Sequence, residues 1–465
     1  MIVIGGGLAG LASGVALAEA GWRVRLFEQR PFLGGRATSY VLPDGEHIDN
    51  CQHVTLGCCT NLADFYQRVG STGKIKFFDR LYFLDSLRRR GELYASILPA
   101  PFHLAASFAT FAPLRIRDKV AIARAMVAIF WAKGKLAAGD EGERISMLEW
   151  LKRRGQTPGA IERFWRVILV SALDEELDRT DAKYGVDVFW KAFLSNRSGY
   201  LMGVPVVPLA ELYDGCKAAI ERQGGEVTLR TPVRGLTIDN GSISGVRFDG
   251  GREESAEAYV FAVPHGELTE LLPESIKKGD AAFQKWDKLK VAPITGVHFW
   301  FDRPVMVEPF VTLLDTTTQW IFNKTSLNGS CATGGQYLQL VISASYDLLN
   351  RPRQEIIDLC LNEVRHVLPQ ARVAQLLKAT VIKEVAATFS PEPGVDRWRP
   401  RQETSVRGLF LAGDWTDTSW PATMEGAVRS GYLAAEAVMR TAGVPQKFLQ
   451  PDLPPDGLTA LWTRL

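Results

Sequence analysis

Residues 5–10 contain four glycines, and the spacing of Gly5, Gly7 and Gly10 brings a protein backbone close to phosphate groups. They form G-x-G-x-x-G between a short β-branched run, residues 2–4, and an Ala/Leu-rich stretch with helical spacing, residues 11–20. In a strand–turn–helix unit, the first glycine allows the tight turn, the second lets the backbone approach a pyrophosphate, and the third lets the helix pack closely on the strand. The phosphates then meet the free N–H groups of the helix N-terminus. The pattern predicts a dinucleotide site that contains Gly5, Gly7, Leu8, Ala9 and Gly10.

An acidic residue and a second pair of glycines follow this unit. Glu28 ends the second expected strand, residues 22–27, where it can accept hydrogen bonds from a ribose 2′-OH and its charge would repel a 2′-phosphate. Gln29 lies beside it and is assigned to the same site. The next candidates are Gly34, Gly35 and Arg36. An arginine after two glycines suits a second phosphate contact, and an ordinary turn with a surface arginine is the alternative.

A third element lies far away in the sequence. The apolar residues 409–412 predict a strand that runs into Gly413 and Asp414, and Thr423 is a suitable N-cap for a helix beyond it. The N-terminus of that helix can stabilise negative charge on a reduced flavin. Asp414 can bind a ribityl or ribose hydroxyl, or it can serve only as a loop acid or a cap. Candidate contacts here and in the strand-like run 226–234 are Gly413, Asp414, Thr423, Met424, Glu425, Ala427 and Val233.

The whole chain has an ordinary globular composition. Its 465 residues carry a formal net charge of +2, with 46% hydrophobic and 23% charged residues, which is typical of ordered domains. Six cysteines are too few for a disulfide scaffold, their spacing fits no metal module, and the balanced charge offers no field for nucleic acid. The N-terminus lacks the basic region of a signal peptide, and no window is apolar enough to span a bilayer. These features predict a cytoplasmic protein without a metal site.

The order of the expected elements predicts an α/β fold with two interleaved domains. A Rossmann-like cofactor domain would take residues 1–75, 201–265 and 395–445. A substrate domain with a mixed sheet and a helical part would take residues 76–200 and 266–394. The expected helices are 60–69, 120–131, 209–223, 353–367 and one from 423 past 434, and the remaining expected strands are 243–249, 258–263, 294–301, 310–314, 320–323, 337–345 and 379–388.

The segment 97–135 is apolar and locally basic. Its helix at 120–131 is apolar almost all round, interrupted by Arg124. The charged residues between 113 and 135 are Arg115, Arg117, Lys119, Arg124, Lys133 and Lys135, with one acid, Asp118. Such a segment is either core that lines a substrate tunnel or a surface that meets anionic lipid headgroups.

The three cofactor elements together resemble those of the FAD-containing amine oxidase and phytoene desaturase superfamily. Finer strings resemble the hydroxysqualene dehydroxylases, also called squalene-associated FAD-dependent desaturases. They are D-N-C-Q-H at 49–53 with L-G-C at 56–58, W-F-D-R-P at 300–304, V-I-S-A at 341–344, A-T-F-S-P at 387–391, L-A-G-D-W-T at 411–416 and P-A-T-M-E-G-A-V-R-S-G at 421–431. The resemblance covers residues 2–438, and Cys51 stands where the family pattern has glycine.

The resemblance implies non-covalent FAD and a reductive step in the bacterial hopanoid route. Hydroxysqualene, a C30 allylic alcohol, would lose its hydroxyl to give squalene, with hydride from N5 of the reduced flavin and an unknown electron donor. Loss of the hydroxyl calls for a general acid and an apolar cleft. His53 and Asp49 are the first candidates for that acid, and Gln52 is a candidate hydrogen-bond partner of flavin or substrate. The alternatives are that His53 orders a loop or only contacts the flavin, and that Asp49 orders backbone.

Three other functions share many of these features. A carotenoid-type desaturase would use the same fold and FAD to oxidise a polyene. An amine oxidase would need an aromatic cage and a lysine near the flavin. A non-catalytic prenyl-binding escort would have lost its flavin, and the intact glycine motif argues against it. A C30 hydrocarbon barely dissolves in water, which favours peripheral contact with the inner face of the cytoplasmic membrane.

Overall fold

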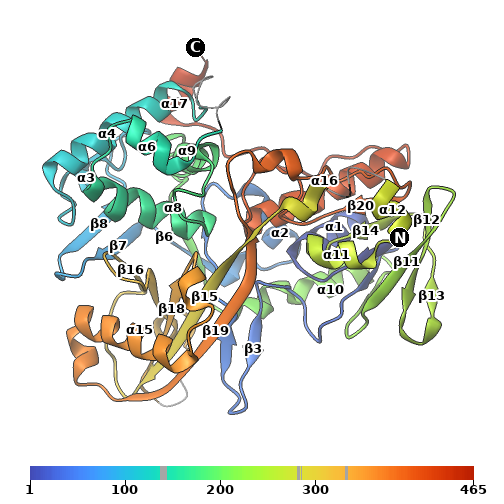
Figure 1. Ribbon diagram of the computed structural model, residues 1–465, viewed down its shortest axis with the longest axis horizontal. Helices are drawn as coiled ribbons and strands as arrows, with labels where there is room; N and C mark the ends of the chain where they lie inside the picture. The colour runs from blue at the N-terminus through green and yellow to red at the C-terminus, as the bar shows by residue number, and fades with distance from the viewer. Residues whose placement is uncertain (137–143, 280–282, 284, 330–333, 465) are drawn as a thin grey trace.

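The computed structural model describes residues 1–136, 144–279, 283, 285–329 and 334–464. It confirms the predicted α/β fold, with a parallel sheet and a separate mixed sheet. Figure 1 shows the parallel sheet and its helices on the right, the helical part at the upper left, and the mixed sheet below that part. Strands of the parallel sheet come from all three segments expected for the cofactor domain, while the domain division itself stays a prediction.

The parallel sheet positions the cofactor loops. In the described part of the chain it has the order β10-β2-β1-β14-β20. Its strands are β1 (Ile2–Ile4), β2 (Arg25–Phe27), β10 (Glu226–Thr228), β14 (Tyr259–Phe261) and β20 (Leu409–Leu411). Three of these short strands are buried along their whole length, as expected for a sheet covered by helices. Since the carboxyl ends of parallel strands share one edge, the loops that carry Gly5 and Gly413 come together there.

Two helices pack closely against each other beside this edge. Helix α1 (Leu8–Glu19) lies against α16 (Met424–Thr441), and it also contacts α10 (Asp214–Glu221). A Cβ at Gly431 of α16 would stand 2.4 Å from the Ala9 carbonyl oxygen of α1, so only glycine permits this approach. The N-terminal turns of both helices therefore face the same loops. Helix α2 (Thr60–Arg68) packs on the other side of α16.

The mixed sheet is the second large sheet of the described chain. Its order in the described chain is β19-β15-β18-β17-β16-β7-β8. The strands are β7 (Arg80–Leu84), β8 (Arg90–Tyr94), β15 (Val291–Phe301), β16 (Phe310–Leu313), β17 (Trp320–Asn323), β18 (Gln336–Ile342) and β19 (Leu376–Phe389). Helix α15 (Arg353–Val367) covers one face, where its Ile356, Cys360 and Val364 share a core with the sheet. The long β15 and β19 run from this sheet toward the parallel sheet (Figure 1).

The helical part packs around a cluster of aromatic side chains. Its helices are α3 (Ala105–Ala109), α4 (Ile116–Trp131), α6 (Met147–Arg153), α7 (Pro158–Ala160), α8 (Arg166–Leu173), α9 (Ala182–Phe189) and the C-terminal α17 (Gly457–Arg464). Trp165 and Phe189, both fully buried, pack 4.5 Å apart between ring centres. Residues 161–165 and 190–194 form π-helical turns, which are often found near functional sites.

The remaining elements are short. They are β3 (Ser39–Val41) and β4 (His47–Asp49); β5 (Thr55–Leu56), β6 (Ile75–Phe78) and β9 (Met202–Pro205); β11 (Val233–Asp239), β12 (Ser242–Phe248) and β13 (Glu253–Glu254); and helices α11 (His265–Leu271), α12 (Glu274–Gly279) and α14 (Lys324–Asn328). β3 pairs with β4, and the two sets of three strands each form a small sheet.

Several expected boundaries were wrong. The run 226–234 divides into β10 and β11, which lie in different sheets, because Arg230 adopts a positive φ of 53° that interrupts an extended strand. Residues 209–213 form a 3₁₀ turn ahead of α10 instead of its first turns. The second strand begins at Arg25 and not at residue 22. The helix expected at 120–131 begins at Ile116.

Candidate active site

A cavity of ≈ 460 Å³ lies where the cofactor loops face the helical part and the mixed sheet. The cofactor end is made by the loops after β1, β2 and β20. The far end is apolar and aromatic, with Leu81, Phe83, Val167, Ile168, Tyr200, Met202 and Trp320 on its wall. Of the predicted cofactor-binding residues, all but Gly10 are among the described residues that line the cavity. His53 and Gln52 also line it, whereas Asp49 is not among the lining residues.

The glycine loop has the shape that a pyrophosphate requires. Gly5 has a φ of +104°, and a Cβ there would stand 2.5 Å from the Ala262 carbonyl oxygen. Gly10 lies behind the loop, where its own Cβ would stand 1.9 Å from the Gly5 carbonyl oxygen. The N-cap of α1 is Gly7, and no side chain among the described residues caps this helix. The first N–H groups of α1 are thus open to an anionic ligand at the cavity wall.

Glu28 stands at the end of β2 with its carboxylate fixed by backbone. Its Oε2 accepts a hydrogen bond from Gly6 N at 2.6 Å, and its Oε1 accepts one from Arg30 N at 2.7 Å. Each oxygen keeps a further acceptor position. Glu28 and the neighbouring Gln29 both line the cavity, so the geometry fits the predicted contact with a ribose hydroxyl.

Arg36 and Asp414 join two motifs that are far apart in the sequence. Arg36 Nη2 donates to Asp414 Oδ1 at 2.7 Å, and Arg36 Nη1 donates to the Ala387 carbonyl oxygen at 2.6 Å. Both side chains line the cavity beside Gly413. The pair places a cation, which suits a phosphate, and a carboxylate, which suits a hydroxyl, at the cofactor end of the cavity. The residues of this end of the cavity therefore fit FAD.

The last helix begins as expected and meets the cavity with its first turn. Thr423 is the N-cap of α16, and its side chain accepts a hydrogen bond from Gly426 N at 3.0 Å. Glu425 lines the cavity but its carboxylate is turned to α2, where it accepts from Leu62 N at 2.7 Å and from Asn61 Nδ2 at 2.9 Å. Burial raises the pKa of Glu425. The Glu425 carboxylate is thus used to bind α2, and its predicted contact with the cofactor would compete with these hydrogen bonds.

Asp49 is buried in an ion pair behind the cavity wall. Lys324 Nζ lies 2.7 Å from Asp49 Oδ2 and 2.8 Å from Gln52 Oε1, and the Asp49 and Lys324 side chains are 3% and 2% exposed. Asp49 Oδ1 also accepts from Leu209 N at 3.0 Å. Burial opposes ionisation of Asp49, but Lys324 together with the hydrogen bonds from Leu209 N and Ser39 outweighs it and holds the pKa below its ordinary value. An ionised carboxylate outside the lining residues is not placed to donate a proton to a ligand.

His53 lines the cavity with one ring nitrogen committed to backbone. Nδ1 lies 2.9 Å from the Cys51 carbonyl oxygen, which can only accept, so Nδ1 carries a proton. Nε2 has no hydrogen-bond partner among the described residues. Burial lowers the pKa of His53, and the ring is therefore mostly neutral at pH 7. Cys51 is not one of the described non-glycine residues that adopt a positive φ. The backbone here accordingly accepts a cysteine in place of the family's glycine without strain.

Sequence reasoning missed several polar residues on the cavity wall. Asp174, Lys191 and Glu384 all line it. Lys191 pairs with Asp187 at 2.5 Å, and Glu384 accepts from Asn50 Nδ2 at 3.0 Å. Thr388 also lines the cavity and belongs to the A-T-F-S-P string, which was a usable signal. Asp174 stands in the acidic run 174–176, which offers no such signal.

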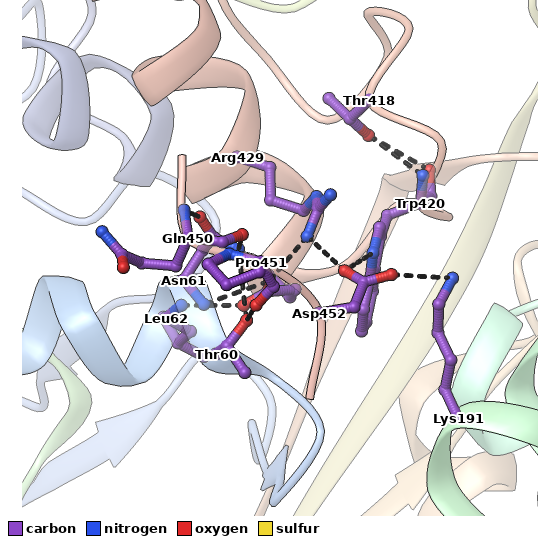
Figure 2. A network of polar contacts seen from close by, with 12 residues as sticks. Thr60, Asn61, Leu62, Lys191, Thr418, Trp420, Arg429, Gln450, Pro451 and Asp452 are labelled. Atoms are coloured by element: carbon purple, nitrogen blue, oxygen red, sulfur yellow. Dashed lines mark hydrogen bonds and ion pairs between the residues drawn. The ribbon is translucent and has the colours of Figure 1, made fainter. Parts of the chain in front are cut away.

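A C-terminal strap, residues 447–456, is held by polar contacts of Gln450, Pro451 and Asp452 (Figure 2). Gln450 N donates to Asn61 Oδ1 at 2.8 Å, which fixes the strap to α2. Asp452 then accepts from Arg429 Nη1 of α16 at 2.7 Å and pairs with Lys191 Nζ at 3.8 Å. Trp420 also donates to Asp452, at 3.3 Å. Since Lys191 and Trp420 line the cavity, the strap ties the cofactor side of the wall to the helical side.

The fold and this cavity define a class: an oxidoreductase that binds a dinucleotide cofactor at the edge of a parallel sheet. Comparison of the sequence places it more closely. Residues 8–439 match the family of flavin containing amine oxidoreductases, and the chain belongs to that family. The family implies a flavin, FAD, as the cofactor, in agreement with the cradle described above.

Known relatives and structures are distant but cover nearly the whole chain. The zeta-carotene desaturase of Synechocystis sp. is 27% identical over 474 residues, 94% of this chain and 96% of that protein. The 15-cis-phytoene desaturase of Solanum lycopersicum is 26% identical over 470 residues, 95% of this chain and 77% of that protein. Among solved structures, an oxidoreductase from Methanosarcina mazei aligns with a TM-score of 0.73 at 19% identity, over 94% of this chain and 99% of the other. That likeness concerns the fold.

Proposed function

We propose that this protein is a FAD-dependent enzyme that removes the hydroxyl group of hydroxysqualene reductively and releases squalene. The resemblance of residues 49–58 and 387–431 to hydroxysqualene dehydroxylases supports the reaction. The relatives named as phytoene and zeta-carotene desaturases support a long isoprenoid substrate. Membership of the flavin family supports hydride chemistry.

The observation that carries the proposal is the continuity of the cavity. One space joins the cofactor cradle to a chamber with an apolar, aromatic wall, and the segment 50–53 lies on that wall. An apolar chamber suits a C30 hydrocarbon, because burying its chain removes apolar surface from water. It would also keep water from the cation that forms when an allylic C–O bond breaks.

The residues of the chain divide into holding, positioning and excluding roles. The glycine loop, Glu28, Arg36 and Asp414 would hold FAD, which when reduced supplies the hydride. The buried Lys324–Asp49 pair would position the segment 49–53, because Lys324 also binds Gln52. Asp49 would thus help to position the backbone and Gln52, and it would not be the general acid. His53 would face the ligand as a neutral imidazole with Nε2 free.

An anaerobic conversion tests the proposal. We expect photoreduced holoprotein mixed with hydroxysqualene to reoxidise its flavin and to form squalene, followed by absorbance and mass spectrometry. Protein reduced without substrate controls for residual oxygen. Flavin that stays reduced while hydroxysqualene remains unchanged would contradict the proposal.

A carotene-type desaturase is the second candidate, because the curated relatives named above carry that activity in their names. It differs in direction: an oxidised flavin would take hydride from a polyene. Oxidised holoprotein with phytoene or zeta-carotene distinguishes the two. Under the proposed function we expect no bleaching of the flavin and no new polyene band, and formation of a desaturated polyene would favour the alternative.

Exposed apolar residues next to basic ones favour delivery of the substrate from a membrane surface. On the segment 97–131 and α17 they are Ile97, Phe102, Ile116, Val120, Val127, Trp131 and Leu461, beside the exposed Arg115, Arg117 and Arg124. Trp462 of α17 packs against Trp131, with ring centres 4.5 Å apart, which joins α17 to this surface. No helix among the described residues is long and apolar enough to cross a membrane. We propose that this surface contacts anionic lipid peripherally.

We expect the double variant Ile97→Asp, Ile116→Asp to float poorly with anionic vesicles. The two side chains are 93% and 81% exposed, so folding should not suffer. Lipid burial of each is worth about 1.5–3 kcal/mol, which is roughly 10- to 150-fold in binding. Vesicle flotation at low and high salt measures the bound fraction. Val307→Asp, at a position 90% exposed elsewhere, is the matched control. Wild-type protein that never floats, even at low salt, would contradict the surface role.

A further inference from the structure

Asp174 is a buried acid on the cavity wall that the roles assigned above do not use. It is the C-cap of α8 and has a positive φ of 54°. Asp174 is only 3% exposed. A non-glycine residue in this conformation is uncommon, although Asp and Asn tolerate it best. Such positions are found at functional sites, where the surrounding structure maintains them.

The partners of Asp174 are neutral. Its Oδ1 accepts from Ala344 N at 2.8 Å, and its Oδ2 lies 3.0 Å from Thr388 Oγ1. Among the described residues, no cation forms an ion pair with Asp174. The titratable groups around it are the adjacent Glu175, which pairs with Arg179 at 3.3 Å, and the Cys51 and Tyr346 side chains. None of these neighbours compensates a negative charge on Asp174.

The physical consequence is that the protonated form of Asp174 is favoured. Burial raises the pKa of Asp174 well above its ordinary value, and the charge of Glu175 adds to the effect. A protonated Oδ2 can donate to Thr388 Oγ1 across the same 3.0 Å. The Thr388 hydroxyl proton is then free to point into the cavity, since both residues line it.

Thr388 stands beside the cofactor end. The preceding residue, Ala387, accepts a hydrogen bond from Arg36 at 2.6 Å, and Arg36 binds Asp414. The pair Asp174–Thr388 therefore reaches from the protein interior to the part of the cavity where cofactor and substrate would meet. Other acids on the wall have different partners: Asp187 pairs with Lys191, Glu384 accepts from Asn50, and Glu267 accepts from Gln29 at 3.5 Å. Glu28, Asp414 and Glu425 make the contacts described above.

We propose that Asp174, acting through the Thr388 hydroxyl, is the proton donor for the departing hydroxyl group, an inference that rests on the proposed function. Asp174 gives its proton to Thr388 Oγ1 while Thr388 gives its own to the substrate oxygen. The C–O bond breaks and water leaves. The carbon receives the hydride that reduced FAD supplies when bound, so the flavin loses two electrons and the substrate gains them. Asp174 is left as a carboxylate and takes a proton from solvent before the next turnover.

The test combines a spectroscopic and a kinetic measurement. In substrate-free protein at pH 7, we expect an infrared C=O band of a protonated carboxyl group that shifts in D₂O and is missing from Asp174→Asn. Asp181→Asn is the matched control, because burial also raises the pKa of Asp181, which lies outside the lining residues and binds backbone N–H groups of Lys183 and Gly394. Asp181→Asn should keep the Asp174 band.

In single turnovers of reduced protein with hydroxysqualene, Asp174→Asn should react about 100-fold more slowly or worse, as for the loss of a general acid. Thr388→Val should be slowed at least 10-fold, and Thr388→Ser, which keeps the hydroxyl, should stay within about threefold. The wild-type rate should fall as pH rises through the pKa of Asp174, whereas the Asp174→Asn rate should not follow that titration.

Two results overturn the inference: an infrared band that survives Asp174→Asn, or near wild-type turnover by Asp174→Asn with an unchanged pH profile. A wild type that makes no squalene while the Asp174 band is present would instead overturn the proposed function, because the protonated carboxyl would then exist without that reaction.

Discussion

Gly10→Ala should yield a protein that is purified without flavin. The new Cβ would stand 1.9 Å from the Gly5 carbonyl oxygen and 3.1 Å from the Ala262 Cβ. The first of these is backbone, so relief requires α1 to move away from the turn after β1. That movement displaces the N–H groups that face the phosphates, and it separates the helix from the strand that positions it.

Flavin content per protein, from the visible spectrum and from chromatography of released cofactor, measures this effect. We expect less than about one tenth of the wild-type content, since a loss of 1.4 kcal/mol already weakens binding tenfold. Gly73→Ala is the matched control, because nothing lies within 4 Å of a Cβ there and its φ is not positive. A yellow Gly10→Ala protein with full stoichiometry would contradict the assignment of the cradle.

Lys324→Met should destabilise the fold by about 3–5 kcal/mol, as for the removal of one partner from a buried ion pair. Lys324 and Asp49 are almost completely buried 2.7 Å apart, and without the ammonium group the Asp49 carboxylate has no compensating cation. The double variant Lys324→Met, Asp49→Asn should recover much of the loss, because both charges are then gone. Lys290→Met, in a more exposed pair with Glu392, should cost at most about 1 kcal/mol.

Urea unfolding at several pH values checks both the size and the sign. In the wild type the pKa of Asp49 is held below its ordinary value, so its contribution is present above about pH 4 and is lost as pH falls through the lowered pKa. In Lys324→Met the hydrogen bonds from Leu209 N and Ser39 remain, but the cation that opposed burial is gone, so the pKa of Asp49 rises. The destabilisation should therefore shrink as pH falls and Asp49 takes up a proton. A midpoint equal to that of the wild type at pH 7 would contradict the account of this pair.

The local motifs were predictable because neighbours in sequence determine them. The glycine loop, the N-cap at Thr423 and the strand before Gly413 depend on turn geometry, capping and apolar patterning within a few residues. Their meeting at one cavity follows from the parallel order of the sheet. The glycine motif and its neighbours therefore predicted most of the residues that line the cofactor end of the cavity.

The polar groups of the reaction end depend on partners far away in sequence. For Asp49 the sequence left two roles open, acid or backbone ordering, and the buried Lys324 beside it lies 275 positions away. For His53 the sequence likewise left a proton donor and a structural role open, because its burial and its bond to Cys51 depend on the three-dimensional fold. Asp174 acquires its character from being enclosed between Ala344 and Thr388. Burial and long-range pairing determine these pKa values, and a single sequence does not display them.

Transfer of a labelled hydrogen tests the central claim most directly. Holoprotein reduced in D₂O carries deuterium at the exchangeable flavin positions and is mixed anaerobically with unlabelled hydroxysqualene. We predict squalene with one deuterium, at the carbon that bore the hydroxyl, formed in step with flavin oxidation. Hydroxysqualene that remains unchanged, together with a polyene that is desaturated by the oxidised protein, would contradict the account.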